Sequence, residues 1–233
     1  MLILAFETSA KAASVALMEG GKLLGEGYQN TGLTHSQTLM VMAEDVLKQC
    51  GRTAQDVGGV AVAEGPGSFT GVRIGVAAAK GFAWGACVPC YGVSTLEAMA
   101  ESLGVYQGYV CACMDARRSQ VYNALFYVNN GVLERRSDDR AISLADLGAE
   151  LAALNAPIFL VGDGADLTHK TLKEQVNVIL PPEHRKHQRA VGVGIIAARM
   201  AENGEAPSGG ALTPNYLRLS QAEREKLERQ NKK

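Results

Sequence analysis

The chain has 233 residues, of which 47% are hydrophobic and 20% are charged, a composition typical of one large globular domain or two smaller ones. Its formal net charge of −1 argues against a protein that binds nucleic acid unaided, because such proteins neutralise phosphates with excess Lys and Arg. There is no run of 18 apolar residues, and Glu7 interrupts the N-terminal apolar run too early for a signal peptide. We therefore expect a cytoplasmic protein that does not enter a membrane.

Strand and helix patterns alternate through the first hundred residues. Short apolar runs bounded by turn residues predict strands, and Glu19-Gly20-Gly21 predicts a hairpin between two of them. Apolar residues at helical spacing and a capping box that begins at Ser94 predict helices. The expected elements are strands at 2–6, 13–18 and 22–28, helix 34–50, strand 59–63, helix 71–84, strand 88–92 and helix 95–103.

The second half repeats this order of elements. We expect strands at 109–114, 120–128 and 132–136, helix 144–154, strands 157–161 and 176–180, and helix 189–202. Three antiparallel strands followed by helix, strand and helix, used twice, predict an α/β protein with the duplicated ribonuclease-H-like fold of actin-like ATPases, each half a mixed sheet flanked by helices. We expect halves at 1–105 and 106–220, with the last helix able to pack back on the first half, and a charged tail at 221–233.

The most unusual segment runs from Gly65 to Gly71, GPGSFTG. Three glycines and a proline in seven residues exclude the interior of a strand or helix. The segment opens a predicted helix, where backbone N–H groups can converge on an anion. Its spacing is neither that of a P-loop nor that of a dinucleotide-binding loop. A phosphate cradle and a turn whose glycines only permit close packing both remain open.

Two carboxylates strengthen the nucleotide interpretation, since Glu7 and Asp115 end the first strand of each half. Active phosphotransferases of this fold hold a metal–nucleotide complex there. Carboxylates at strand ends are also commonly solvated or paired with arginines, here Arg117 and Arg118. The candidate site for ATP or ADP comprises Glu7, Gly65, Gly67, Ser68, Thr70, Gly71 and Asp115.

Five cysteines without an export signal indicate reduced thiols. Cys87, Cys90, Cys111 and Cys113 form two close pairs that would suit zinc. Both pairs lie in apolar runs without the turn residues of a zinc knuckle, so buried structural cysteines are the better interpretation. A serine hydrolase is disfavoured because Ser68 is not in a GxSxG elbow.

Several segments together resemble the bacterial TsaB (YeaZ) family. They are LILAFETSAKAASVAL, THSQTL, GPGSFTGVRIG, MDARRSQVY and LTPNYLRLS, spread from residue 2 to about 220. The resemblance implies a non-catalytic relative of TsaD that works with TsaD and the ATPase TsaE. Together they install threonylcarbamoyladenosine at position 37, beside the anticodon, of tRNAs that read codons beginning with A.

The resemblance also implies where a catalytic metal would lie. The catalytic paralogue holds it through two histidines at i and i+4 of the first helix, a spacing that puts both rings on one face. Here His35 is followed four residues later by Leu39, which is not a ligand. We therefore expect no metal and no cofactor of the chain's own, and we interpret the glycine loop as an inherited turn that starts a partner-facing helix.

Two helices are more apolar than a core-facing stripe requires. Residues 39–43 of the first predicted helix are all apolar, so some of them must lie outside its core-facing stripe. In the helix over 71–84, Gly71, Gly75 and Ala79 form a smooth strip that permits close helix approach, although packing on a sheet favours the same residues. The predicted partner interface comprises His35, Leu39, Met40, Met42, Val46, Arg73, Gly75 and Ala79.

These observations predict a scaffold subunit of the threonylcarbamoyladenosine machinery. It would bind the TsaD-like paralogue and the TsaE-like ATPase, form a homodimer when alone, and contact tRNA only indirectly or slightly. The alternative is an ATP-dependent phosphotransferase of the actin-like fold that acts on a small metabolite.

Overall fold

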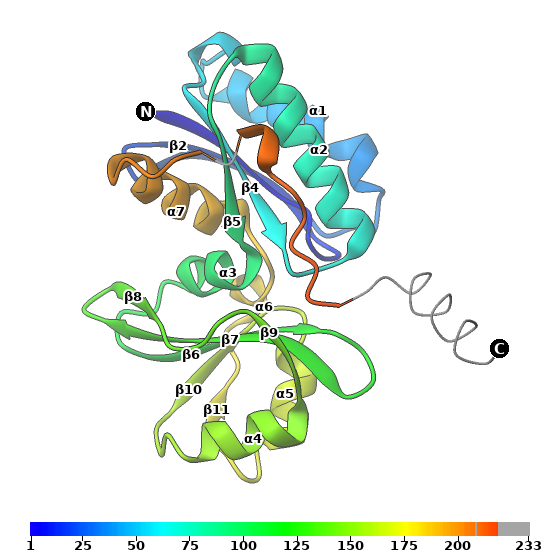
Figure 1. The fold of residues 1–233 in the computed structure, drawn as a ribbon, viewed down its shortest axis with the longest axis vertical. Helices are drawn as coiled ribbons and strands as arrows, with labels where there is room; N and C mark the ends of the chain where they lie inside the picture. Colours follow the sequence, from blue (N-terminus) through cyan, green and yellow to red (C-terminus); the bar gives the residue numbers. More distant parts are fainter. Residues whose placement is uncertain (208, 219–233) are drawn as a thin grey trace, which may run out of the picture.

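The chain folds into two α/β halves stacked end to end, as the computed structural model shows (Figure 1). The structure describes residues 1–207 and 209–218; the predicted tail at 221–233 lies outside them. The sheet of the first half has the strand order β3-β2-β1-β4-β5, with β1 antiparallel to β2 and parallel to β4. Its strands are β1 (Leu2–Glu7), β2 (Ala13–Glu19), β3 (Lys22–Gln29), β4 (Gly59–Gly65) and β5 (Cys90–Ser94).

Helices cover both faces of this sheet. Successive side chains of a strand point to opposite faces, so Leu4 and Phe6 of β1 pack beneath α1 and α2, whereas Ile3 and Ala5 pack beneath α7. The last long helix therefore belongs to the core of the first half, although it is the most distant in sequence. These helices are α1 (His35–Gln49), α2 (Phe69–Ala86) and α7 (Ala190–Glu202).

The second sheet repeats the first in its topology. Its order is β11-β10-β6-β7-β8, in which β6 takes the place of β1, antiparallel to β7 and parallel to β10. The added β9 pairs with β7. The strands are β6 (Gly108–Asp115), β7 (Gln120–Asn129), β8 (Val132–Arg135), β9 (Arg140–Ser143), β10 (Ile158–Val161) and β11 (Val178–Ile179). Taken from its other edge, the second sheet has the order β8-β7-β6-β10-β11, which matches β3-β2-β1-β4-β5 strand by strand. This match confirms the predicted duplicated ribonuclease-H-like fold.

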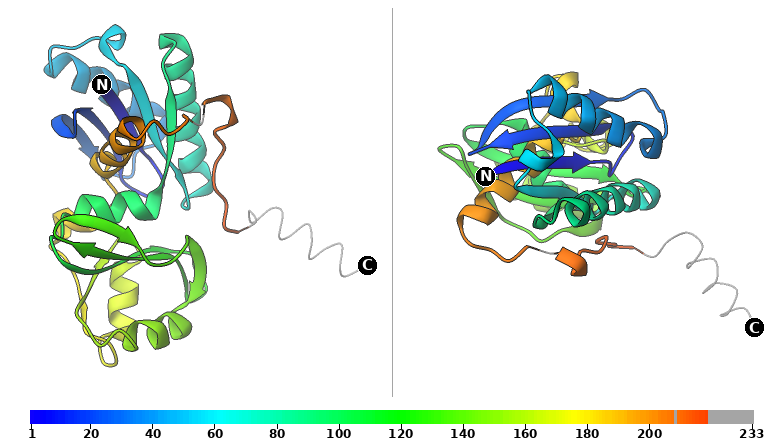
Figure 2. Two further views of the ribbon diagram at one scale, coloured as in Figure 1. Left: turned by 60° about the vertical axis from the view of Figure 1, so that its left-hand side comes forward. Right: turned by 90° about the horizontal axis from the view of Figure 1, so that it is seen from above.

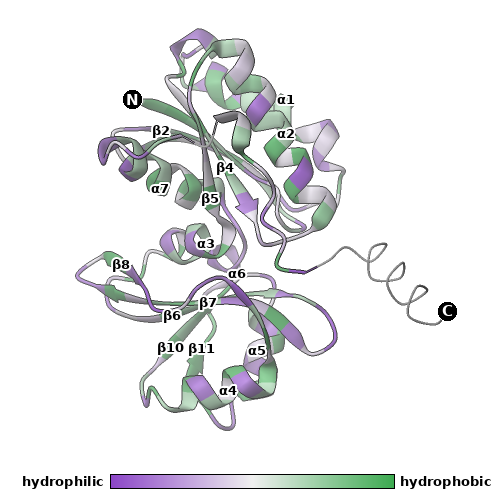
Figure 3. Cartoon of the chain, viewed as in Figure 1, coloured by the Kyte–Doolittle hydropathy of each residue, from purple (hydrophilic) through white to green (hydrophobic). Residues whose placement is uncertain are grey.

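Helix α3 separates the halves and packs on one face of the second sheet, while α4 and α5 cover the other. Polar and apolar bands alternate along α4 (Figure 3), because Leu144, Leu147 and Leu151 face the sheet. Among the described helices, none is long and apolar enough to cross a membrane. The helices are α3 (Thr95–Leu103), α4 (Leu144–Ala152), α5 (Ala165–Leu172) and α6 (Glu183–Lys186), with 3-10 turns at Ala54–Asp56 and Gly209–Ala211.

Several element boundaries differ from the prediction. Helix α2 begins at Phe69, because the Ser68 side chain caps it. The sequence pattern missed β9, α5 and α6; α5 has only three buried residues, Ala165, Thr168 and Leu172, so its apolar stripe is too weak to recognise. The strand expected at 176–180 shrinks to β11.

The cysteines separate into different environments. Cys90 is buried in the first sheet, whereas Cys111 and Cys113 share a face of β6 in the core of the second. Cys87 is exposed at the end of α2. Burial raises the pKa of the Cys90 thiol to about 11. The expectation of buried structural cysteines is therefore confirmed for Cys90, Cys111 and Cys113 and is wrong for Cys87.

The last described segment, residues 209–218, is here named the C-terminal strap. It runs beside α2 toward the space between the halves (Figures 1 and 2). Leu212 is buried beneath α2, and Lys80 Nζ donates to its carbonyl oxygen at 3.1 Å. The Asn215 N–H donates to the Glu64 carbonyl at 2.7 Å, and Arg218 Nη1 donates to the Ala116 carbonyl in the second half at 2.7 Å. The strap therefore joins the two halves.

Candidate functional site

The glycine loop packs directly against the turn that follows β1. The Ser68 N–H donates to the Ser9 carbonyl at 2.6 Å, and Thr8 Oγ1 donates to the Gly71 carbonyl at 2.8 Å. A Cβ on Gly67 would lie 2.5 Å from the Ser9 carbonyl oxygen, and one on Gly71 would lie 2.1 Å from that of Thr8. The loop needs glycine because two backbone segments touch here.

This packing uses groups that a phosphate cradle would need. The Ser68 N–H bonds to Ser9, and the Gly71 N–H bonds to the Ser68 hydroxyl at 3.3 Å. Gly65 approaches the strap, since a Cβ there would lie 2.5 Å from the Asn215 carbonyl oxygen. Thr70 is exposed. The geometry favours the packing turn over the phosphate cradle.

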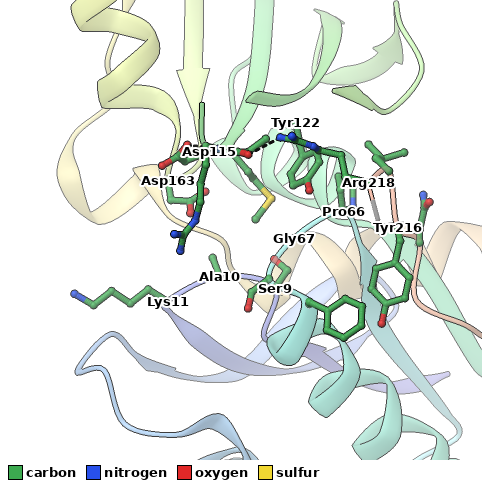
Figure 4. Close-up of a pocket in the computed structure, with 17 residues that line it drawn as sticks. Ser9, Ala10, Lys11, Pro66, Gly67, Asp115, Tyr122, Asp163, Tyr216 and Arg218 are labelled. Carbon is green, nitrogen blue, oxygen red and sulfur yellow. Dashed lines mark hydrogen bonds between the residues drawn. The ribbon is translucent and has the colours of Figure 1, made fainter. Parts of the chain in front are cut away.

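A cavity of about 480 Å³ lies between the halves, where the turns after β1 and β6 meet the glycine loop and the strap. Ser9 and Gly67 from the first half face Asp115 and Asp163 from the second across it, and Lys11 extends outward at its edge (Figure 4). Arg117 also lines the cavity. We name this cavity the interhalf cleft.

The two predicted carboxylates have different environments. Glu7 is fully buried and does not line the cleft. Its Oε1 accepts the Ser9 N–H at 2.5 Å, and its Oε2 has no partner among the described residues. Burial, with a smaller contribution from Asp163, raises the pKa of Glu7 to about 7. Asp115, by contrast, is exposed and accepts the Arg117 N–H at 2.7 Å.

Asp163 is the carboxylate that sequence reasoning missed as a site residue. It follows β10 in Gly162-Asp163-Gly164, and its position after a strand was the available signal. Desolvation raises its pKa, and Gln188 Nε2 donates to its Oδ1 at 3.1 Å. No cluster of three His, Cys, Asp or Glu side chains able to hold a metal occurs within residues 1–207 and 209–218.

The predicted partner interface requires correction. Leu39, Val46, Gly75 and Ala79 are buried within the chain, so they cannot contact a partner in this structure. A Cβ on Gly75 would lie 2.4 Å from the Thr8 hydroxyl oxygen, which shows that the smooth strip serves the fit of α2 onto the sheet. The helical stripe that sequence reasoning assigned to a partner is the core-facing one.

The remaining interface candidates are partly or fully accessible. Met40 is 43% exposed, while Met42 is only partly buried and packs on the first core. His35 is the first residue of α1, and its Nε2 lies 2.8 Å from the carbonyl oxygen of Ala10 in the turn after β1. Arg73 is exposed, and its Nε donates to the Tyr216 hydroxyl of the strap at 2.7 Å.

The outward faces of α1 and α2 carry large apolar and small residues. Both helices cover the same face of the first sheet, and both lie on the outside of the first half (Figure 1). Val41 is 58% exposed and Trp84 is 86% exposed, and no atom lies within 4 Å of a Cβ added to Gly81. We name this surface the outer α1–α2 face; its members are Met40, Val41, Ala77, Gly81 and Trp84.

Comparisons with known proteins agree with this fold. The TsaD family, described as tRNA N6-adenosine threonylcarbamoyltransferase, matches residues 29–226. The chain is 33% identical to the tRNA threonylcarbamoyladenosine biosynthesis protein TsaB of Bacillus subtilis (strain 168), over 99% of this chain and 100% of that protein. It is 35% identical to TsaB of Escherichia coli (strain K12), over 94% of this chain and 95% of that protein.

Solved structures give the same result. A Pseudomonas aeruginosa protein described as similar to peptidase YeaZ superposes with a TM-score of 0.81 at 27% identity, covering 93% of this chain and 99% of that chain. YeaZ from Pseudomonas aeruginosa superposes with a TM-score of 0.73 at 25% identity, covering 91% and 98%. The chain therefore belongs to the TsaB (YeaZ) family of tRNA threonylcarbamoyladenosine biosynthesis proteins, within the wider TsaD family.

Proposed function

We propose that this chain is a non-catalytic subunit of the threonylcarbamoyladenosine machinery and binds a TsaD-type catalytic paralogue through the outer α1–α2 face. The observation that carries the proposal is the exposure of Met40, Val41 and Trp84 on two adjacent helices. Large apolar side chains gathered at the surface are typical of protein interfaces. The exposed small residues Ala77 and Gly81 of α2 would permit close approach of a partner helix.

A non-catalytic role is supported by the residues around the glycine loop. Leu39 occupies the helical position four residues after His35 and is 1% exposed, so no second imidazole joins His35 there. The loop N–H groups of Ser68 and Gly71 bond within the chain. Glu7 is sealed in the core. The chain's contribution to threonylcarbamoyl transfer at position 37 is therefore to hold the paralogue in a competent form.

The same face accounts for the chain's other expected associations. An unpaired apolar face favours self-association, so we infer a homodimer in the absence of the paralogue. The TsaE-like ATPase would join the paired complex. Modification would then occur on tRNAs that read codons beginning with A.

The alternative function, an actin-like phosphotransferase, is favoured by one observation. The interhalf cleft holds about 480 Å³ and presents Asp115 and Asp163, which suits a metal-bound ATP or ADP. Calorimetry with ATP and Mg²⁺ on the isolated chain separates the two functions, because tight binding with turnover contradicts a scaffold.

The decisive experiment mixes the chain with the TsaD-like paralogue of its own organism and measures the mass of the complex. Val41→Asp places a charge on the outer α1–α2 face and should weaken association about a hundredfold, because a buried unpaired carboxylate costs about 3 kcal/mol. Val132→Asp is the matched control, since Val132 is 62% exposed on β8 of the other half. Equal association of both variants with the paralogue would place the interface elsewhere.

A further inference from the structure

The loop between β6 and β7 has an unusual backbone. Arg117, Arg118 and Ser119 have φ values of 62°, 56° and 56°, so three consecutive residues with side chains adopt the left-handed conformation. Cβ atoms clash with the backbone in this region, which makes even single occurrences uncommon. Such conformations persist where the surroundings impose them, and they gather at functional sites.

Hydrogen bonds hold the loop in this conformation. Two hydrogen bonds within the loop backbone close turns. The first residue of α4, Leu144, bonds to the Ser119 carbonyl, and Arg218 of the strap also bonds to the loop. The bonds are Arg117 N to Asp115 Oδ1 at 2.7 Å, Ala116 N to Gln120 O at 3.0 Å, Gln120 N to Arg117 O at 3.2 Å, Leu144 N to Ser119 O at 3.1 Å and Arg218 Nη1 to Ala116 O at 2.7 Å. The loop therefore presents its two arginines from a fixed backbone, which lowers the entropy lost when they bind a ligand.

Within residues 1–207 and 209–218, no carboxylate pairs with either of these two arginines. Arg117 and Arg118 are both exposed. Arg135, Arg136 and Arg140 of the same half each pair with Asp or Glu. Among the described residues, the three arginines on or beside β8 and β9 are thus paired with carboxylates, whereas the two loop arginines are not.

A third cation reaches the same place from the first half. Lys11, in the turn after β1, is exposed and lines the interhalf cleft together with Arg117. Asp115 and Asp163 also line that cleft, and their carboxylates disfavour a small anion lodged inside it. Arg118, the next residue, is exposed but does not line the cleft, so the basic residues extend beyond the cleft. The arrangement suits an extended polyanion that crosses the rim.

We propose that Lys11, Arg117 and Arg118 contact the phosphate backbone of RNA, so that this subunit binds the tRNA directly. The inference rests on the proposed function for its choice of polyanion. A net charge of −1 means that the contact is local, and arginine guanidinium groups bind phosphate oxygens without reading sequence. It assigns a direct RNA contact where composition had indicated an indirect one.

The test compares two double variants in fluorescence anisotropy with a labelled tRNA transcript, from 50 to 200 mM salt, on the chain alone and on its complex with the paralogue. Arg117→Gln/Arg118→Gln removes both loop charges. Lys22→Ala/Arg52→Ala removes two charges at the opposite end of the first sheet. Glu19 lies beside Leu2, at the start of β1, and forms an ion pair with Arg52. The loop variant should bind about tenfold more weakly, and the slope of log K against log salt should fall by about two.

The control variant should change neither quantity appreciably. Equal losses in both variants, an unchanged slope in the loop variant, or no measurable RNA binding in either form of the wild-type chain would overturn the proposal. The mass of the complex is measured on the same samples. A loop variant that still associates with the paralogue but binds tRNA more weakly supports the RNA contact. If the wild-type chain fails to associate with the paralogue, only the docking proposal is refuted, because RNA binding is still measured on the chain alone.

Discussion

The turns after β1 and after β6 occupy equivalent positions in the two halves but have opposite character. The first begins with buried residues, with Glu7 in the core and Thr8 against the glycine loop, and becomes exposed at Lys11. The second is exposed, and it holds Asp115 and, on a left-handed backbone, two arginines that form no ion pair within the described part of the chain. The two halves therefore share their topology, whereas the carboxylate that ends the first strand is buried in one half and exposed in the other.

The largest expected effect tests the packing of the first turn. Gly71→Ala would put a Cβ 2.1 Å from the Thr8 carbonyl oxygen, so it should lower the free energy of unfolding by about 3 kcal/mol or more. Gly81→Ala is the matched control, because nothing lies within 4 Å of its Cβ and the helix should gain about 0.5–1 kcal/mol. Urea denaturation measures both. Similar stabilities for the two variants would show that the first turn is not tightly packed.

The next effect concerns Glu7, whose pKa rises from 4.5 unfolded to about 7 folded through burial. Between these values the folded state binds more protons than the unfolded state, so stability falls as pH rises through this window. Glu7→Gln should abolish that loss and stabilise the protein at pH 8 by about 3 kcal/mol, from about 1.4 kcal/mol per pKa unit.

Asp115→Asn is the control for this pH dependence, because the equivalent carboxylate is exposed. It should change the unfolding free energy by less than about 0.5 kcal/mol at pH 8. Urea denaturation series at pH 5, 6.5 and 8 give the comparison. A Glu7→Gln variant that retained the wild-type pH profile would mean that another group dominates.

The smallest expected effect tests the strain of the second turn. Glycine adopts the left-handed conformation readily, so Arg118→Gly should raise the free energy of unfolding by about 0.5–1 kcal/mol. Arg185→Gly, on the exposed side of α6, should instead lower it by a similar amount, since glycine weakens a helix. Chemical denaturation resolves the opposite signs, and a loss of stability in both variants would argue against strain at position 118.

The fold was largely predictable because apolar runs such as Leu2–Glu7 and Gly108–Asp115 are buried on both faces and mark the central strands unambiguously. The interface was not, because small residues suit helix–sheet and helix–helix packing equally, and only the structure shows that Gly75 faces Thr8. The left-handed loop was also beyond sequence reasoning. Arginine carries no signal for positive φ, and two of the bonds that hold the loop come from residues distant in sequence, Leu144 and Arg218.

The position of α7 has a consequence for synthesis of the chain. One face of the first sheet is covered by α7, whose Ala190 N–H bonds to the Ser14 hydroxyl across 176 positions, and Leu212 completes the other face. During translation the N-terminal half emerges first but lacks these parts of its core until residues 190–212 have also left the ribosome. Its folding must wait for the C-terminal segments, while the second sheet, which is continuous in sequence, can form before it.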